Sequence, residues 1–317
     1  MKTTISIAIA THDRPQCLRR AIDSIVAQEH KPLEIIVVND GADEIDASLG
    51  DLCQSSGIPF IVERRHTPCL PASRNCAIDR ASADVVLLLD DDCYLRSDYI
   101  ARLASLYDAD EEELVAAVGA RIDDVPSRTF KGGIIKALSF VLGRGPWCGP
   151  RCKARHIRLN KSLAGRLVPV HRLTGGGISV RRQIARAHRF DERLGGWALF
   201  EDTEFCLRLG MSHGVFLAPQ LKLWHDPGVG GRPNLHNRGR MYVCNFLHIL
   251  KYSFPSGAGA WLLFFYGVGG IMTLYALLSV MSLHSRHLAF VAGAFGELLR
   301  HLGQWANAAI WGKGAAG

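Results

Sequence analysis

Three consecutive aspartates, Asp90, Asp91 and Asp92, end an apolar run in the sequence LLLDDDC. Adjacent carboxylates repel one another, and helix capping would account for one of them but not for three. Carboxylates at the first and third positions of such a turn can hold a hard divalent cation that also binds a diphosphate. The triplet therefore predicts a cation site, with Asp90 and Asp92 as its candidate pair and Mg²⁺ or Mn²⁺ as its candidate cofactor.

Other polar residues follow similar apolar runs. Asp40 ends the run in EIIVVNDGA, where a carboxylate can accept hydrogen bonds from a nucleobase N–H or a ribose hydroxyl. Asp-Gly is also a common turn, so this signal is weak alone. It gains weight from THDR, which holds Thr11 and Arg14, and from ASRN, which holds Arg74. The planar guanidinium of Arg74 suits a phosphate group.

These residues need a scaffold that brings them together, and residues 1 to 120 have the pattern of one. Short β-branched runs alternate with turns and helix-period segments, which is typical of an α/β layered sheet. Ligands of such open sheets lie at the carboxyl ends of the strands. The expected strands are Ile5–Ala10, Glu34–Asn39, Ile58–Glu63, Val85–Leu89 and Leu114–Gly119, and the expected helices include Arg14–Gln28, Ala72–Ala81 and Asp98–Tyr107.

The charge of the chain favours an anionic partner. The net charge is +7, and the segment from Val125 to Phe190 holds no Asp or Glu but fifteen Lys or Arg residues. Such a segment can be a solvated basic face. The largely apolar stretch Ile134–Leu142 around Lys136 instead favours contact with an anionic membrane surface or a lipid-linked phosphate.

Two apolar segments end the sequence. Ala258–Leu283 has 26 residues without a charged side chain or His, and at about 1.5 Å per residue it would exceed the ~30 Å hydrocarbon core of a bilayer. A buried core helix is the alternative. The second segment, Leu288–Trp311, is interrupted by Glu297, Arg300 and His301, so we expect it to lie at the interface or to re-enter rather than to span.

The nine cysteines do not form a recognisable framework. Their number is odd, and only Cys148 and Cys152 stand close together, which does not resemble the pattern of a secreted disulfide protein. A structural zinc site would need a second close pair of Cys or His, and none is evident. The sequence therefore predicts reduced thiols, no zinc site and a cytoplasmic location for most of the chain.

The order and spacing of these motifs resemble family 2 glycosyltransferases of the GT-A fold, which are inverting enzymes with nucleotide-sugar donors. The resemblance covers roughly residues 3 to 226. It rests on THDRPQCL, VVNDGA, ASRNCAIDRASADVVLLLDDDC, GGGISVRR and GWALFEDTEF. It implies an α/β fold with a GT-A type nucleotide-sugar-binding sheet and flanking helices. The two apolar segments described above would add a C-terminal membrane helix and an interfacial helix.

The resemblance also implies roles for individual residues. Asp202 would be the catalytic base, with Glu201 beside it. The other implied roles are nucleoside, ribose or diphosphate binding by Thr11, Arg14, Asp40, Arg74, Asp90 and Asp91, metal binding by Asp92 and His225, and an acceptor loop of Gly175, Gly176, Gly177 and Trp197. A His after a strand is often structural, and three glycines can be a flexible turn, so these alternatives stay open.

The catalytic segment departs from the family pattern at one position. The family more often continues Glu-Asp-x-Asp-Leu, whereas this chain has Glu204 at the fourth position. The carboxylate is kept, so the assignment of Asp202 as the base stands. Phe205 and Leu209 recur at helical spacing, which predicts a helix whose N-terminal end presents Asp202.

The expected reaction is transfer of a hexosyl or deoxyhexosyl group from a UDP- or dTDP-sugar to a hydroxyl of a lipid-linked or envelope glycan. Transfer to polyprenyl phosphate is the alternative reaction, and a non-catalytic membrane-bound adaptor is the alternative class. A dehydrogenase is excluded because THDRPQ replaces the G-x-G-x-x-G after the first strand, and no nucleic-acid partner is expected.

The same reasoning predicts the organisation of the chain. Residues 1–120 would bind the nucleotide sugar, residues 121–256 would hold the basic segment, the acceptor site and the catalytic residues, and residues 257–317 would form membrane-associated helices. The protein would lie on the cytoplasmic membrane with its catalytic domain in the cytoplasm.

Overall fold

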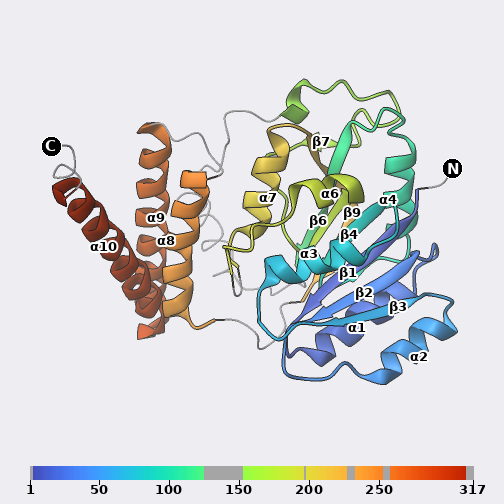
Figure 1. The fold of residues 1–317 in the computed structure, drawn as a ribbon, viewed down its shortest axis with the longest axis horizontal. Coiled ribbons are helices and arrows are strands. Elements are labelled where there is room, and N and C mark those ends of the chain that lie inside the picture. Colours follow the sequence, from blue (N-terminus) through green and yellow to red (C-terminus); the bar gives the residue numbers. More distant parts are fainter. Residues whose placement is uncertain (1–2, 125–152, 196–197, 227–232, 253–257, 312–317) are drawn as a thin grey trace. The chain divides into compact units, whose positions relative to one another are not determined.

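The computed structural model describes residues 3–124, 153–195, 198–226, 233–252 and 258–311. The described residues form two compact units, one up to residue 226 and one from residue 233 onward. The first unit is an α/β structure and the second is made of helices (Figure 1). The predicted α/β class with a C-terminal apolar helix is confirmed.

One mixed sheet organises the first unit. Its strands run in the order β3-β2-β1-β4-β8-β6-β9-β5, and β7 pairs with β9. The first four are mutually parallel, and β8 is antiparallel to β4 and β6. The strands are β1 (Ile5–Thr11), β2 (Glu34–Asn39), β3 (Phe60–Arg64), β4 (Val85–Asp90), β5 (Cys93–Leu95), β6 (Val115–Asp124), β7 (Val168–Pro169), β8 (Gly177–Arg181) and β9 (Gly214–His225).

Helices cover both faces of this sheet, which explains the continuous apolar runs of its strands. Side chains alternate between the faces, so Ile7 and Ile9 join one hydrophobic cluster and Ala8 joins the other. Helices α1 (Pro15–Val26), α2 (Ala47–Ser55) and α4 (Tyr99–Asp108) contribute to the first cluster, and α3 (Leu70–Arg80), α6 (Arg182–His188) and α7 (Glu201–Gly210) contribute to the second.

The expected strands and helices of this unit are present with small changes of length. The third strand begins at Phe60 rather than Ile58, and the strand expected to end at Gly119 continues to Asp124. The first helix begins at Pro15, where a proline is tolerated because the first helical N–H has no partner within the helix. The helix expected after Asp202 is α7, which begins at Glu201.

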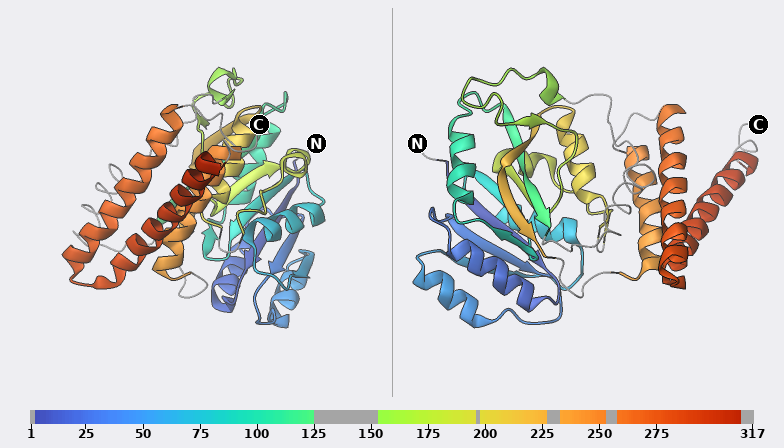
Figure 2. Two further views of the ribbon diagram at one scale, coloured as in Figure 1. Left: turned by 60° about the vertical axis from the view of Figure 1, so that its left-hand side comes forward. Right: turned by 180° about the vertical axis from the view of Figure 1, so that it is seen from behind.

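The second unit consists of helices α8 (Leu235–Tyr252), α9 (Ala258–Ser282) and α10 (Leu288–Trp311), with a short 3₁₀ turn at Ser285–His287. Each helix contacts the other two, and Figure 2 shows the three lying together. Contacts thus group α8 with the C-terminal helices, although the sequence analysis assigned residues up to 256 to the preceding part. The functional division of the chain into three parts stays a prediction.

Helix α9 is long and apolar enough to cross a membrane, by length and composition. Its segment Gly259–Ser282 has a mean hydropathy of 1.8, and it is the candidate span among the described residues. Several of its large apolar side chains are exposed, with Leu262 at 71% and Val280 at 72%. A core helix would bury such side chains, so this exposure does not match the alternative of a buried core helix.

Candidate active site

Three predicted site residues lie where parallel strands end. Thr11 is the last residue of β1, Asp40 directly follows β2, and Asp90 ends β4. Because β1 pairs with both β2 and β4, the three residues share one edge of the sheet. This is the edge at which open α/β sheets bind ligands.

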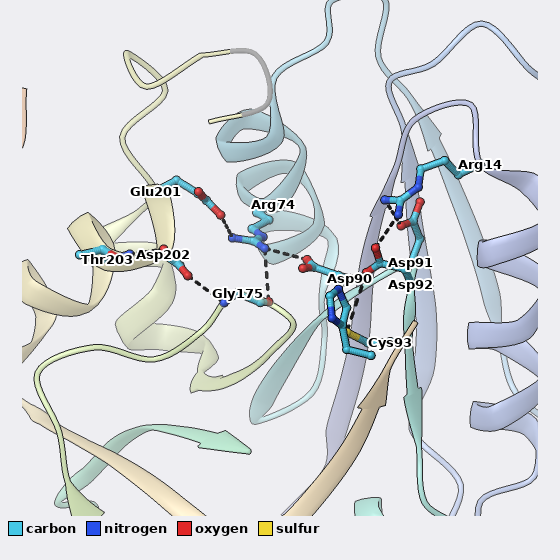
Figure 3. Close-up of polar contacts among 11 residues, drawn as sticks. Arg14, Arg74, Asp90, Asp91, Asp92, Cys93, Gly175, Glu201, Asp202 and Thr203 are labelled. Atoms are coloured by element: carbon cyan, nitrogen blue, oxygen red, sulfur yellow. Dashed lines mark hydrogen bonds and ion pairs between the residues drawn. The ribbon is translucent and has the colours of Figure 1, made fainter. Parts of the chain in front are cut away.

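Arg14 and Thr11 hold the acidic triplet in place. Arg14 donates from Nη1 to Asp91 Oδ1 at 2.8 Å and from Nη2 to Asp92 Oδ2, as Figure 3 shows. The Thr11 hydroxyl donates to Asp91 Oδ2 at 2.8 Å. Both Asp91 oxygens therefore accept hydrogen bonds from the protein, and the side chain is buried. Asp91 thus fixes the turn that carries Asp90 and Asp92.

Asp91 and Asp92 have different environments, which shift the pKa values of their carboxyl groups in opposite directions. Burial raises the pKa of Asp91 to about 7, although Arg14 and the Thr11 hydroxyl oppose the rise. Burial also disfavours the Asp92 anion, but the contact with His225 and the charge of Arg14 outweigh it and lower the pKa of Asp92 to about 2. Asp92 is therefore the firmly anionic member of the buried pair.

The donor set at Asp92 fits a divalent cation. His225 ends β9, which pairs with β5, and its Nε2 lies 3.6 Å from Asp92 Oδ1. That spacing suits two ligands of one ion, since Mg²⁺ and Mn²⁺ accept carboxylate ligands together with water and phosphate oxygens, and imidazole is a further ligand of first-row metals. The predicted metal residues are thus brought together.

Arg74 joins the acidic triplet to the predicted catalytic segment. Its buried guanidinium, on α3, donates to Asp90 Oδ1 at 2.9 Å, to Glu201 Oε1 at 2.7 Å and to the Gly175 carbonyl at 3.3 Å. Burial disfavours the charge of Arg74, but Glu201, Asp90 and Asp202 outweigh it and raise the pKa of the guanidinium. Its predicted contact with the sugar donor stays a prediction.

Loss of the Arg74 charge should weaken the first unit markedly. Replacing Arg74 with methionine leaves Glu201 buried without its cation, which typically costs about 3–5 kcal/mol and lowers Tm by roughly 6 °C or more. The control is Arg189→Met, because the Arg189–Asp79 pair is exposed and such pairs contribute about 1 kcal/mol or less. Thermal unfolding followed by circular dichroism compares them, and equal shifts would contradict a structural role for Arg74.

Asp202 lies in the first turn of α7 and is less buried than its neighbours. Its Oδ2 accepts the Gly175 N–H at 2.9 Å, and its Oδ1 accepts the Thr203 N–H at 2.6 Å. Acidic residues are favourable at a helix N-terminus because of the helix dipole. Unlike Asp202, Glu201 and Glu204 are buried.

The two glutamates have structural partners. Burial raises the pKa of Glu201, the Asp202 carboxylate adds to this rise, and Arg74 opposes it. Glu204 accepts from Arg208 Nε at 2.8 Å within the same helix. Glu204, the residue that departs from the family pattern, therefore pairs with Arg208 and stabilises α7.

Asp40 has protein partners that the sequence analysis did not identify. Its Oδ2 accepts the Cys69 N–H at 3.0 Å and the Ser73 hydroxyl at 2.9 Å, and its Oδ1 lies 3.0 Å from His12 Nδ1. Asp40 thereby fixes the start of α3, which carries Arg74. Its predicted contact with the nucleoside stays a prediction. His12, in the motif THDR, was the available signal for this arrangement.

A second missed residue, Asp13, closes the loops after β1 and β2. Its Oδ1 accepts the N–H groups of Ala42 at 2.6 Å and of Asp43 at 3.0 Å. Beside it is a cavity of about 560 Å³, whose lining includes Thr11, Asp13, Arg14, Asn39, Asp43 and Leu49. This volume is in the range of small-molecule pockets.

The three glycines of the predicted acceptor loop are in close contact with other side chains. A Cβ at Gly175 would lie 2.8 Å from Arg74 Nη2, and one at Gly177 would lie 2.3 Å from a Leu223 methyl. A Cβ at Gly176 would lie 2.9 Å from Cys93 Sγ. Packing therefore explains these glycines, and their part in acceptor binding stays a prediction. Trp197 lies outside the described residues.

Several known proteins are similar to parts of this chain. The glycosyltransferase GlyA of Streptococcus pneumoniae is 32% identical over 104 residues, which are 31% of this chain and 14% of that protein. A Campylobacter jejuni GalNAc(5)-diNAcBac-PP-undecaprenol beta-1,3-glucosyltransferase is 31% identical over 101 residues, 31% of this chain and 33% of that protein. The chain thus spans a third or less of the length of these relatives.

A similar solved structure is the mannosyltransferase PcManGT of Pyrobaculum calidifontis in complex with GDP-Man and Mn²⁺. It has a TM-score of 0.54 at 13% identity, over 94% of this chain and 88% of that one, which shows a shared fold. The model of the family described as Glycosyl transferase family 2 matches residues 6–167, just over half of the chain. The chain therefore belongs to glycosyl transferase family 2.

Proposed function

We propose that the chain transfers a sugar from a nucleoside diphosphate donor to a hydroxyl of a lipid-linked or envelope glycan, with inversion at the anomeric carbon. The observation that carries the proposal is the position of Arg74 between Asp90 and Glu201. This bridge connects the strand-end carboxylates with the residue beside Asp202. The bridge thus has carboxylates for a cation and the donor diphosphate at one end and a candidate proton acceptor, Asp202, near the other.

The donor diphosphate would bind beside Asp92 and His225, which would hold a divalent cation. That cation would supply positive charge to the leaving diphosphate. The complex of PcManGT with GDP-Man and Mn²⁺ supports this assignment. Thr11 and the cavity beside Asp13 are the proposed environment of the nucleoside.

Asp202 would act as the general base. It would accept the proton of the acceptor hydroxyl as the hydroxyl oxygen forms its bond to the anomeric carbon. The bond from that carbon to the diphosphate oxygen would break at the opposite face, and its electron pair would leave with the diphosphate. The half-buried position of Asp202 supports this role, whereas Glu201 is buried against Arg74.

A lipid-linked acceptor is supported by two observations. The Campylobacter relative acts, by its name, on an undecaprenol-linked glycan. In this chain α9 is a candidate membrane span, and part of the acid-free basic segment belongs to the first unit. Polyprenyl phosphate itself is the second candidate acceptor, since the same basic side chains suit a phosphate.

The deciding experiment incubates the full chain with Mn²⁺, a panel of UDP-, dTDP- and GDP-sugars, and either polyprenyl phosphate or a polyprenyl diphosphate-linked saccharide. Transfer to the saccharide with inverted anomeric configuration supports the proposal. Transfer only to polyprenyl phosphate supports the second acceptor. Donor binding without any transfer would identify an adaptor and contradict the enzymatic proposal.

Membrane attachment should depend on the second unit. We expect the full chain to require detergent and residues 1–231 to be largely released from membranes, with residual binding that weakens at high salt because it is electrostatic. The measurement is fractionation of both chains at low and high salt.

A third chain, residues 1–256, serves as the comparison. It retains α8 without α9 and α10, so Phe246 loses its contact with Phe264 and Tyr242 loses its contact with Phe290, and aggregation is expected. Full-length protein that is folded and soluble without detergent would contradict the membrane assignment.

A further inference from the structure

Helices α8 and α10 run parallel in a regular register. Arg240 contacts Glu297, and Cys244 contacts His301, so both pairs are 57 residues apart in the chain. His236 and Gly293 meet at the same separation. Because successive pairs are four residues apart on each helix, the contacts form a row along one face of each helix. Figure 2 shows the two helices side by side.

Glycines bring the backbones of this pair unusually close. A Cβ at Gly239 would lie 2.1 Å from the Phe290 carbonyl oxygen, and one at Gly293 would lie 2.0 Å from the His236 carbonyl oxygen. The helices therefore touch through their backbones near the start of the row. A side chain as short as that of Cys244 can then reach the opposite helix.

Three metal-ligating atoms converge next to this crossing. Cys244 Sγ lies 2.9 Å from Glu297 Oε1 and 3.9 Å from His301 Nε2, and the last two atoms are 3.3 Å apart. Glu297 is only 3% exposed, while the other two side chains are half-buried. We propose that Cys244, Glu297 and His301 form a zinc-binding site that joins α8 to α10.

The distances and atom types fit this ion. Tetrahedral Zn²⁺ binds sulfur at about 2.3 Å and nitrogen or oxygen at about 2.0–2.2 Å, so its ligand atoms lie roughly 3.3–3.6 Å from one another. The observed triangle needs adjustments of about 0.6 Å or less at its Cys244 corner, which rotation of the thiol supplies. A thiolate, an imidazole and a carboxylate together favour Zn²⁺ over Mg²⁺.

The surrounding arginines have distinct parts. Arg240 Nε lies 3.2 Å from Glu297 Oε2, the oxygen outside the triangle, and so orients the carboxylate. Arg300 donates to Oε1 and lies 3.3 Å from His301 Nε2, so in this state its guanidinium covers the face where the ion would bind. The Arg300 side chain is 51% exposed and can turn outward into solvent.

When Arg300 turns outward, the ion takes over its part in balancing the charge of the buried Glu297. The Cys244 thiol loses its proton to solvent, and the thiolate and the Glu297 carboxylate together neutralise Zn²⁺. The site also gives a reason for the polar residues that interrupt the apolar sequence of α10. The expectation of no zinc site was based on close pairs along the chain, whereas these ligands come from two helices.

The test uses the full chain and Co²⁺ as a spectroscopic probe for Zn²⁺. We expect one equivalent of Co²⁺ to give a thiolate-to-metal charge-transfer band, which is lost in Cys244→Ser and in His301→Gln and is displaced by Zn²⁺. Arg300→Ala should strengthen binding, because it uncovers the site. The controls are Cys76→Ser and His248→Gln, which change the same residue types elsewhere and should keep the band.

The outcomes separate this site from the donor site. Asp92→Ala should leave the thiolate band unchanged, since the donor site is not expected to contain a thiolate. Absence of the band in the wild-type chain, or its persistence in both Cys244→Ser and His301→Gln, would overturn the proposal. Circular dichroism of each metal-free variant identifies any loss of fold, and the two ligand variants provide independent readings.

Discussion

Replacing Asp202 with asparagine is expected to lower the rate of sugar transfer by about 10²-fold or more, the scale of a lost general base. The amide keeps the size of the side chain and one oxygen that can accept the Gly175 N–H or the Thr203 N–H. It cannot take up the acceptor proton. Binding of the sugar donor should change little, because Asp202 adjoins Glu201, whereas the proposed metal ligand Asp92 belongs to the acidic triplet that Arg74 contacts through Asp90.

The measurement is initial transfer rate together with calorimetric titration of the donor. Asp51→Asn is the matched control, because Asp51 is an exposed aspartate on α2 that does not line the cavity beside Asp13, and its replacement should leave both quantities unchanged. Weakened donor binding with an unchanged maximal rate would make Asp202 a binding residue instead of the base.

Replacing Asp92 with alanine is expected to abolish metal-dependent transfer while the fold is retained. The change removes the carboxylate that lies next to His225 and, on the other side, an acceptor of Arg14. Arg14 keeps its hydrogen bond to Asp91, so the turn after β4 should persist. The readouts are transfer rate as a function of Mn²⁺ concentration and the far-ultraviolet circular dichroism spectrum.

Asp23→Ala is the control for this variant, since Asp23 is an exposed aspartate on the α1 helix. It should show the wild-type dependence on Mn²⁺. If Asp92→Ala retained that dependence as well, the metal assignment would be wrong, although the role of Asp202 would be unaffected.

The parallel part of the sheet was predictable because its strands carry a simple signal. Ile7, Ala8 and Ile9 are consecutive apolar residues, and the cover on both faces of the sheet explains why residues of both faces are apolar here. The shared location of the polar residues that follow these runs was predictable as well. Once strands are parallel, their carboxyl ends meet at one edge, and Thr11, Asp40 and Asp90 must share it.

The division of roles within the acidic triplet was not predictable from the sequence. Which aspartate is buried depends on how the turn after β4 directs each side chain toward Arg14. The partners of Asp40 were equally hidden, because His12 and Ser73 come from different elements. The grouping of α8 with α10 depends on glycine contacts across 57 residues of chain, which no local periodicity records.

The shared use of Arg74 by Asp90 and Glu201 has a consequence for variation of the chain. Residues that share one buried partner show non-additive effects, often by about 0.5–3 kcal/mol. If Glu201 loses its charge, Asp90 must compensate more of the cost of burying the Arg74 charge. If Asp90 is lost, Glu201 must do so instead. The three positions, which are up to 127 residues apart, are therefore energetically coupled. Sequences that keep this fold should change these three residues together or leave all of them unchanged.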